Sequence, residues 1–288
     1  MELCLLLVII LNFNQMKKAT LFLVVLIAIL CNSCEEVINV DLKTAPPKLV
    51  IEASINWLKG TDGNEQKIKL TTTTDFYNNI IPKVSGATIF IKNSSNTQFD
   101  FIEKPKTGEY ICTTFIPVIN ETYTLTIISD GQTYTAVEKL KPVPTITKIV
   151  QNNRGGFTGN TIEIKAFYND VANEDNYFLY KYVYSTQIKS NYYVDQDTFF
   201  QGNEFFSISQ NNELKVGDKV EISHFGISKL YYNYMNVLVD IAGNTNGSPF
   251  QSPPATVRGN IINTTNFDNF ALGYFSVSEV DTKNYVIQ

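Results

Sequence analysis

Apolar and polar residues alternate with a period of two along most of the chain, which is the pattern of half-buried β-strands. The first clear run covers residues 49–57, where Ile51 and Ala53 alternate with Glu52 and Ser54. Further strands are predicted in the N-terminal half at 67–72, 87–92, 98–102, 109–115, 122–128 and 132–138. In the C-terminal half they are predicted at 161–168, 177–186, 204–209, 218–225 and 271–277.

Turn and helix signals interrupt this pattern at two places. Asp130 and Gly131 separate two strand patterns and form a pair that a type I′ hairpin turn prefers, because both positions need a positive φ. Residues 228–241 predict one amphipathic helix packed on the sheet, with Ser228 at its N-cap and Gly243 at its end. The apolar residues that recur at helical spacing are Leu230, Tyr234, Val237, Leu238 and Ile241.

Two β-domains are expected from the spacing of the strands. Pro142 and Pro144 follow seven predicted strands, and proline cannot continue a strand ladder, so this stretch is interpreted as a stiff linker. The expected fold class is mainly β. An N-terminal immunoglobulin-like β-sandwich over 48–141 is followed by a second β-sandwich or barrel-like domain over 142–288, which carries the helix.

The N-terminal segment has the features of a secretory signal peptide. Lys17 and Lys18 precede an apolar run over 21–30, and small polar residues follow it. The run is shorter than the roughly 20 residues that a membrane-spanning helix needs. Met16 directly precedes the two lysines, so residues 1–15 are interpreted as the product of a mis-assigned start codon.

Cys34 is the candidate lipid-attachment residue. The end of the signal peptide resembles a bacterial lipobox, in which cleavage occurs before a diacylated cysteine, and Ser33 is small enough for the position before the cut. Cys31 fits less well because Leu30 would occupy that position. The signal peptide is thus expected over 1–33 and a lipidated tether over 34–47, while plain secretion and an unprocessed anchor remain alternatives.

Composition narrows the possible functions. The chain has 288 residues, 44% of them hydrophobic, and a formal net charge of −5. That hydrophobic content excludes disorder, and the acidic balance argues against a nucleic-acid partner. After cleavage only Cys112 remains besides Cys34, so no intramolecular disulfide is expected, and Cys112 is interpreted as a small core residue.

Candidate chemistry is sparse. His224, the one histidine, is expected at the surface or a sheet edge rather than as a base, and no metal, cofactor or catalytic residue is predicted. Asp195, Asp197 and Asn203 offer oxygen ligands for Ca²⁺, although a polar loop is the preferred interpretation. The long irregular loop 244–258 is of a kind that often carries function.

The aromatic residues of the second half allow two interpretations. They line a sugar- or peptide-binding face, or they fill the core and rim of a β-sandwich, which is the preferred interpretation. The residues concerned are Tyr177, Tyr180, Tyr182, Tyr184, Tyr192, Tyr193, Phe199 and Phe200.

Several short motifs together resemble one protein family over almost all of the exported chain. The motifs are CEEVINV at 34–40, KLVIE at 48–52, ETYTL at 121–125, GQTYTA at 131–136, PVP at 142–144, LKVGDKV at 214–220, NI at 260–261 and ALGYF at 271–275. They are similar to a Bacteroidota outer-membrane lipoprotein family known only as a domain of unknown function (4249).

The resemblance implies a cellular setting rather than a reaction. Members of the family are usually encoded beside TonB-dependent receptors, and Glu35 and Glu36 after the lipidated cysteine resemble the tag that directs lipoproteins of this phylum to the cell surface. The expected function is therefore that of a non-enzymatic, lipid-anchored outer-membrane protein that acts with such a receptor as an accessory or solute-capturing subunit, with a solute of unknown identity. A structural or adhesive cell-envelope lipoprotein is the alternative, and a hydrolase is the least favoured class.

Overall fold

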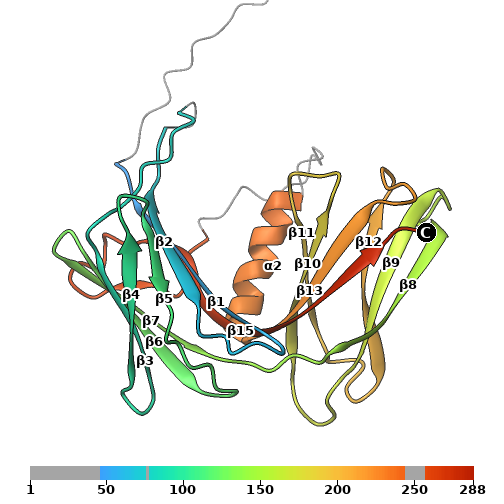
Figure 1. Cartoon of the computed structure of the whole chain (residues 1–288), viewed down its shortest axis with the longest axis horizontal. Helices are drawn as coiled ribbons and strands as arrows, with labels where there is room; N and C mark the ends of the chain where they lie inside the picture. Colours follow the sequence, from blue (N-terminus) through green and yellow to red (C-terminus); the bar gives the residue numbers. More distant parts are fainter. Residues whose placement is uncertain (1–45, 76–77, 244–256) are drawn as a thin grey trace, which may run out of the picture. The chain divides into compact units, whose positions relative to one another are not determined.

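The computed structural model describes residues 46–75, 78–243 and 257–288, so the predicted signal peptide, Cys34 and most of the loop 244–258 lie outside the described residues. Residues 46–288 form one compact unit. Within the described residues it consists of β-strands and a single helix, α2 (Lys229–Gly243) (Figure 1). The predicted fold class, mainly β with sandwich architecture and one helix, is confirmed.

Eight strands, seven from the first half of the chain and one short strand from its C-terminal part, curl around one hydrophobic core. Along the sheet their order is β1-β2-β5-β4-β3-β6-β7-β14. Their bounds are β1 (Leu49–Leu58), β2 (Gln66–Thr72), β3 (Thr88–Asn93), β4 (Gln98–Lys104), β5 (Glu109–Cys112), β6 (Thr122–Ser129), β7 (Gln132–Lys139) and β14 (Ile262–Asn263). The side chains that alternate inward from these strands are fully buried, including Ile51, Tyr110 and Leu125. Cys112 is buried and free, as its interpretation as a core residue requires.

The turn between β6 and β7 has the predicted geometry. Asp130 and Gly131 have φ values of 47° and 68°. Ser129 pairs with Gln132 across this two-residue loop. The type I′ hairpin is therefore confirmed, and it sets the register of all eight residue pairs between the two strands.

The second half packs two layers of sheet face to face around a second core. One layer is formed by β11 (Asn191–Gln196), β10 (Tyr177–Tyr184), β13 (Lys219–Ile227) and the end of β15 (Leu272–Val286). The other is a separate three-stranded sheet of β12 (Glu204–Asn211), β9 (Thr161–Asn169) and β8 (Ile146–Gly155). The alternation pattern did not predict β8, β11 or β14.

The last strand, β15, connects the two cores. Its first part runs parallel to β1, with Val50 to Leu58 paired to Leu272 to Val280. Its second part runs antiparallel to β13 as far as Val286. Sequence alone predicted a shorter strand, at 271–277.

The predicted domain border at 141/142 does not separate the two cores along the chain. Phe275 and Val277, from the predicted second domain, are part of the first core, whereas Ile287 is part of the second core. The proline-rich stretch is docked on β15 rather than extended as a free linker. Val143 is buried and its amide donates to Glu279 at 2.9 Å, and the amide of Ile146 donates to Asp281 at 2.7 Å.

Helix α2 starts where Ser228 predicts. The Ser228 hydroxyl accepts a hydrogen bond from the Tyr231 amide at 3.1 Å and donates to the Glu138 carboxylate at 3.0 Å. The helix packs on β10, β11 and β13 through a small apolar cluster that includes Met235 and Leu179. The prediction that the apolar residues at helical spacing pack on the sheet was wrong in part. Four of these five residues are exposed: Leu230 (69%), Val237 (41%), Leu238 (38%) and Ile241 (38%).

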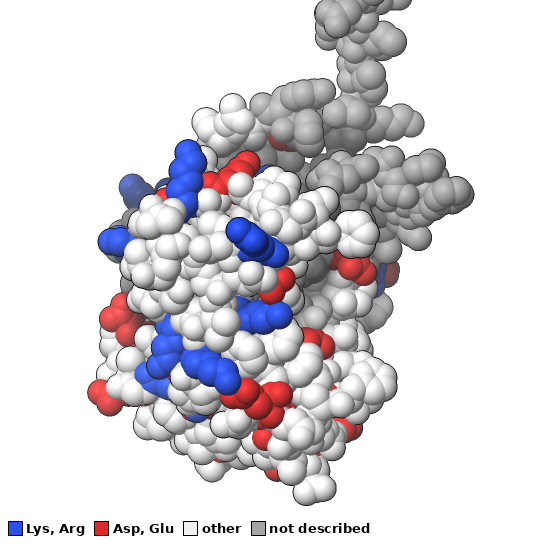
Figure 2. All heavy atoms as spheres, turned by 90° about the vertical axis from the view of Figure 1, so that its right-hand side faces the viewer, with Lys and Arg blue, Asp and Glu red and all other residues white. Residues whose placement is uncertain are grey.

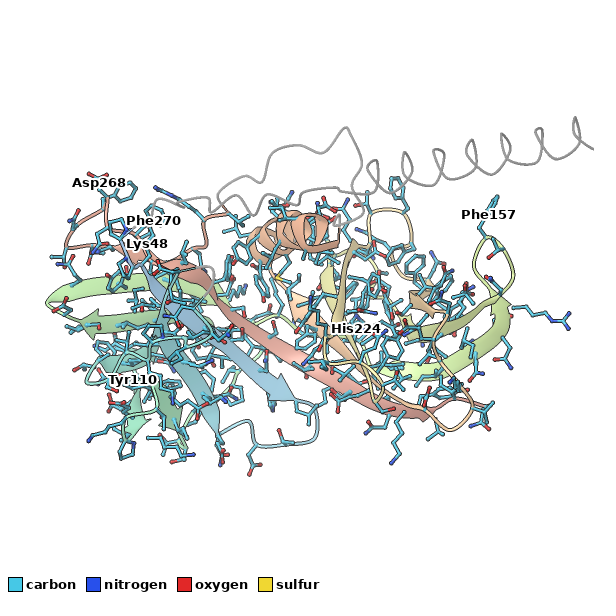
Figure 3. The ribbon with its side chains drawn as sticks, turned by 90° about the horizontal axis from the view of Figure 1, so that it is seen from above. Lys48, Tyr110, Phe157, His224, Asp268 and Phe270 are labelled. Atoms are coloured by element: carbon cyan, nitrogen blue, oxygen red, sulfur yellow. The ribbon has the colours of Figure 1, made fainter. Side chains whose placement is uncertain are left out.

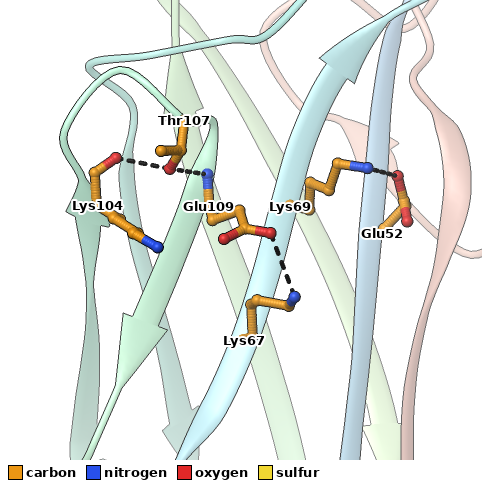
Figure 4. Close-up of polar contacts among 6 residues, drawn as sticks. All are labelled: Glu52, Lys67, Lys69, Lys104, Thr107 and Glu109. Carbon is orange, nitrogen blue, oxygen red and sulfur yellow. Dashed lines mark hydrogen bonds and ion pairs between the residues drawn. The ribbon is translucent and has the colours of Figure 1, made fainter. Parts of the chain in front are cut away.

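Five surface lysines of the described residues pair with glutamates. On the outer face of β1, β2 and β5, Lys69 pairs with Glu52 and Lys67 pairs with Glu109, both at 3.3 Å (Figure 4). The face that carries the three-stranded sheet also has basic and acidic residues next to one another (Figure 2). There Lys148 pairs with Glu204 at 2.9 Å. Exposed pairs of this kind contribute little to stability, about 0–1 kcal/mol each.

Candidate functional site

A cavity of about 230 Å³ lies on the face of the large sheet against which α2 packs. Five strands and the helix contribute to it, so its residues come from widely separated parts of the sequence. The lining residues are Ser54, Asn56, Leu179, Lys181, Tyr192, Phe225, Tyr231, Ser276 and Ser278.

Small polar side chains from β1 and β15 form one side of the cavity. The parallel register of these strands sets Ser54 beside Ser276 and Asn56 beside Ser278. Ser276 and Ser278 are only 3% and 2% exposed. The side chain of Gln66 fixes this part of β1, because it accepts from the Asn56 amide and donates to the Asn56 carbonyl, each at 3.0 Å. The cavity thus offers hydroxyl and amide groups from two rigidly paired strands.

Larger side chains from β10, β11, β13 and α2 form the other side. Leu179 pairs with Phe225 on one neighbouring strand, and Lys181 pairs with Tyr192 on the other. Tyr231 approaches from the first turn of α2. These residues surround the cavity with three aromatic rings, one aliphatic side chain and one ammonium group.

Lys181 is the one basic side chain among the described residues that line this cavity. Among residues 46–75, 78–243 and 257–288, no carboxylate oxygen lies within 4.0 Å of its ammonium nitrogen. Lys67 and Lys69, on the neighbouring part of the same sheet, each have a glutamate partner. A positive charge in a partly enclosed polar cavity favours a negatively charged ligand group.

The Tyr231 hydroxyl acts as a neutral hydrogen-bonding group at neutral pH. Desolvation raises its pKa to about 12, and a hydrogen bond with Ser276 offsets part of that increase. Its ring lies 4.6 Å from the ring of Tyr274 and 6.2 Å from that of Tyr234 (centroid distances), so it is held between helix and sheet. Tyr231 can therefore donate or accept a hydrogen bond without changing its charge.

His224 is not at the surface or at a sheet edge, and this prediction was wrong. It lies inside the second sandwich (Figure 3) and is 1% exposed. Strand β13 is an interior strand between β10 and β15, and His224 is on its core-facing side, where the rings of Tyr168, Phe178 and Tyr180 lie 4.5–4.9 Å away.

Burial keeps the His224 imidazole neutral. Desolvation lowers its pKa to about 3, and the carbonyl of Pro144 offsets only part of this effect. Neither ring nitrogen makes a hydrogen bond of normal geometry with any described residue. His224 is thus separated from the cavity, on the opposite face of the sheet.

The aromatic residues divide between the two interpretations. Tyr180, Tyr182 and Tyr184 are at most 2% exposed and belong to the second core. Their hydroxyls bond to Tyr168, Ser207 and Ser209 respectively, each at 2.7 Å. Tyr192 instead lines the cavity, while Phe199 is 93% exposed. Filling of the core is therefore confirmed for the three tyrosines that alternate along β10.

The oxygen ligands considered for Ca²⁺ stabilise a turn. Asp197 is 2% exposed, and its carboxylate accepts hydrogen bonds from the amide and the side chain of Asn176 at 2.8 and 3.1 Å. The side-chain amide of Asn203 donates to the Gln201 carbonyl at 3.2 Å. In the described part of the chain, no group of three or more His, Cys, Asp or Glu residues is placed to hold a metal ion.

A second cavity, of about 180 Å³, is lined by residues between 258 and 271, including Phe270. The ammonium of Lys48 and the guanidinium of Arg258 lie 3.7 and 3.9 Å from the centre of that ring (Figure 3). These cations stack on the aromatic ring and stabilise the local packing. The cavity lacks the row of hydroxyl groups that the first cavity has.

Sequence reasoning did not identify the first cavity. The available signal was in β15, where Ser276 and Ser278 alternate with the core residues Phe275 and Val277. These serines lie on the face of β15 opposite the core, and Tyr231 of α2 completes the cavity over that face.

Comparison with known proteins identifies a family for this chain. A family model described as a domain of unknown function (DUF4249) matches residues 35–284. No curated protein matches the sequence. No helix of the described residues is long and apolar enough to span a bilayer.

Similar solved structures resemble this one only weakly. A two fibronectin type-III domain segment from chicken tenascin has 13% identity and a TM-score of 0.21, with 62% of this chain and 90% of that chain covered. A DUF4785 family protein from Legionella pneumophila has 10% identity and a TM-score of 0.26, with 64% and 54% covered. The FN1–FN3 domains of chicken CNTN1 have 11% identity and a TM-score of 0.20, with 64% and 60% covered.

Proposed function

We propose that this chain, which belongs to the family described as a domain of unknown function (DUF4249), is a non-enzymatic, lipid-anchored outer-membrane protein that captures a small solute for a TonB-dependent receptor. The observation that carries the capture role is the cavity between α2 and the sheet, with its hydroxyls, its aromatic rings and the ammonium group of Lys181. Ligand sites commonly combine apolar walls with a few convergent polar groups in this way.

The sequence supports the membrane anchor. A signal peptide over 1–33 followed by Cys34 fits processing as a bacterial lipoprotein, in which the diacylated cysteine also receives an N-acyl chain. Stable anchoring needs more than one lipid chain, and this modification supplies several. The acidic pair Glu35 and Glu36 agrees with export to the cell surface.

An exposed apolar row on α2 supports a protein partner. Leu230 is 69% exposed, and Val237, Leu238 and Ile241 continue the row along the helix. Exposed apolar surface of this kind is typical of interaction sites. Tyr231, adjacent in sequence to Leu230, lines the cavity, so a receptor bound to this row would lie close to the captured solute.

Extraction of membranes with mild detergent tests the proposal. The full-length protein is expected to co-purify with an outer-membrane barrel, and mass spectrometry is expected to find acyl chains on Cys34. The Cys34→Ala variant should appear in the soluble fraction. Leu238→Glu should keep the anchor but lose the barrel, whereas Lys219→Gln, on β13 outside the cavity, should keep both. A barrel-free preparation of the wild type would contradict the receptor partnership.

A structural or adhesive role is the second candidate. Phe157, at the tip of the β8–β9 turn, and Phe199 are 107% and 93% exposed, and such rings suit contacts with other surfaces (Figure 3). Deletion of the gene separates the two roles. Impaired growth on a limiting solute supports capture, whereas altered adhesion with unchanged growth supports the second role.

A further inference from the structure

The cavity has one polar side and one apolar side, and this asymmetry restricts its ligand. Ser54, Ser276, Ser278 and Asn56 present hydroxyl and amide groups along two paired strands. Opposite them are the rings of Phe225, Tyr192 and Tyr231, and Leu179. A flat molecule with hydroxyl groups on its edge and C–H groups on its face satisfies both sides at once.

The charge of Lys181 adds a third requirement. Lys181 lies on β10 next to Tyr192 and has no carboxylate partner among the described residues. None of the described residues that line the cavity is acidic. A ligand carboxylate would form a charge-assisted hydrogen bond with this ammonium group.

We infer that the cavity binds a monosaccharide-sized sugar acid, with its carboxylate on Lys181, its hydroxyls on the serine and asparagine side chains, and its C–H face against the tyrosine rings. The volume of about 230 Å³ suits a single sugar ring rather than an oligosaccharide. The inference rests on the proposed capture role and specifies its substrate class.

The arrangement also disfavours other ligand classes. A purely apolar ligand would make no hydrogen bond with the polar side of the cavity and would cover the charge of Lys181 without pairing it, which is costly in a partly buried site. A cationic ligand would be repelled by Lys181 and would find no carboxylate in the cavity. A neutral sugar fits the shape but leaves the charge unused.

Isothermal titration of the detergent-solubilised full-length protein tests this inference with two matched pairs of probes, D-glucuronate with D-glucose and D-galacturonate with D-galactose. At least one acid is expected to bind about tenfold or more tightly than its neutral partner. Lys181→Gln should remove that preference, whereas Lys219→Gln, which changes a lysine on β13 outside the cavity, should retain it.

Three outcomes would overturn the inference: no binding of either acid, equal binding of acid and neutral sugar, or a preference that survives in Lys181→Gln. These results are independent of the receptor experiment. Sugar-acid binding without co-purification of a barrel would contradict the receptor partnership alone. Co-purification without sugar-acid binding would leave the partnership intact and remove the assigned ligand.

Discussion

His224 and Lys181 lie on adjacent strands but in opposite environments. Strand alternation directs His224 into the second core, where burial lowers its pKa to about 3. Lys181 is on the other face of the sheet, where it lines the cavity and keeps its charge available for a ligand. At the scale of single residues, the face of the strand therefore decides whether a polar group has a structural or a binding role.

The buried imidazole predicts acid-sensitive stability. Its folded-state pKa is below the unfolded value of about 6.5, so the unfolded chain binds the extra proton and stability falls as the pH decreases from 6.5 towards 3. Between pH 6.5 and pH 5 the free energy of unfolding should decrease by about 1–2 kcal/mol less in the His224→Phe variant than in the wild type. Urea unfolding at both pH values measures this, and an unchanged difference would contradict it.

Gly273 predicts a strict requirement for glycine. Its φ is +105°, and an added Cβ would lie 2.0 Å from the Ile51 carbonyl oxygen of β1. Gly273→Ala should therefore destabilise the fold by more than about 3 kcal/mol. Gly217→Ala is the matched control, because Gly217 has a φ of +94° with open space around it. This variant should lower the free energy of unfolding by only about 1–2 kcal/mol. Equal losses in thermal or urea unfolding would show that the contact with β1 is unimportant.

At the scale of elements, β15 is covered on both faces. Phe275 and Val277 face the first core, while Ser276 and Ser278 line the cavity beside α2. A single strand thus contributes apolar residues to packing and polar residues to the candidate site. Ser228 fixes the first turn of α2, and the position of this turn decides how far the two serines are enclosed.

Removal of the Ser228 hydroxyl is expected to weaken the start of α2. Ser228→Ala loses the bond from the Tyr231 amide and the bond to Glu138, which should cost about 1 kcal/mol of stability. Ser228→Thr retains a hydroxyl and should lose much less. Urea unfolding monitored by far-UV circular dichroism compares the two variants, and similar losses would argue against the cap.

At the scale of the whole described unit, the shared strand β15 should make unfolding cooperative. The first core contains Phe275 and the second contains Ile287, and both residues belong to one continuous C-terminal segment. The segment that joins the halves is also docked on β15 through Glu279 and Asp281. Loss of either core is therefore expected to remove support from the other.

The single tryptophan provides a local probe of this coupling, because Trp57 packs against the first core. Ile222→Ala, in the second core, should destabilise by about 2–4 kcal/mol and lower the Trp57 fluorescence midpoint in urea by a corresponding amount. Ile102→Ala, at a 70% exposed position, should leave that midpoint nearly unchanged. A Trp57 midpoint insensitive to Ile222→Ala would indicate two independent domains.

Local patterns allowed much of the fold to be predicted. The turn at Asp130 and Gly131 and the helix start at Ser228 depend on neighbouring residues alone, so both were predicted correctly. The short edge strand β14 pairs at only two positions, with Tyr134 and Thr135 of β7, and such a long-range pairing leaves no local pattern.

The sequence by itself determined the β-rich class, the helix that follows Ser228 and the interpretation of Cys112 as a core residue, because alternation, capping and hydrophobicity act between near neighbours. Only the tertiary structure decided that His224 is buried and that Lys181 and Ser276 line one cavity. These placements require that strands far apart in the sequence pair with one another and that the helix covers one face of the sheet. Period-two alternation shows which face of a strand is buried, but it does not show which strands become neighbours.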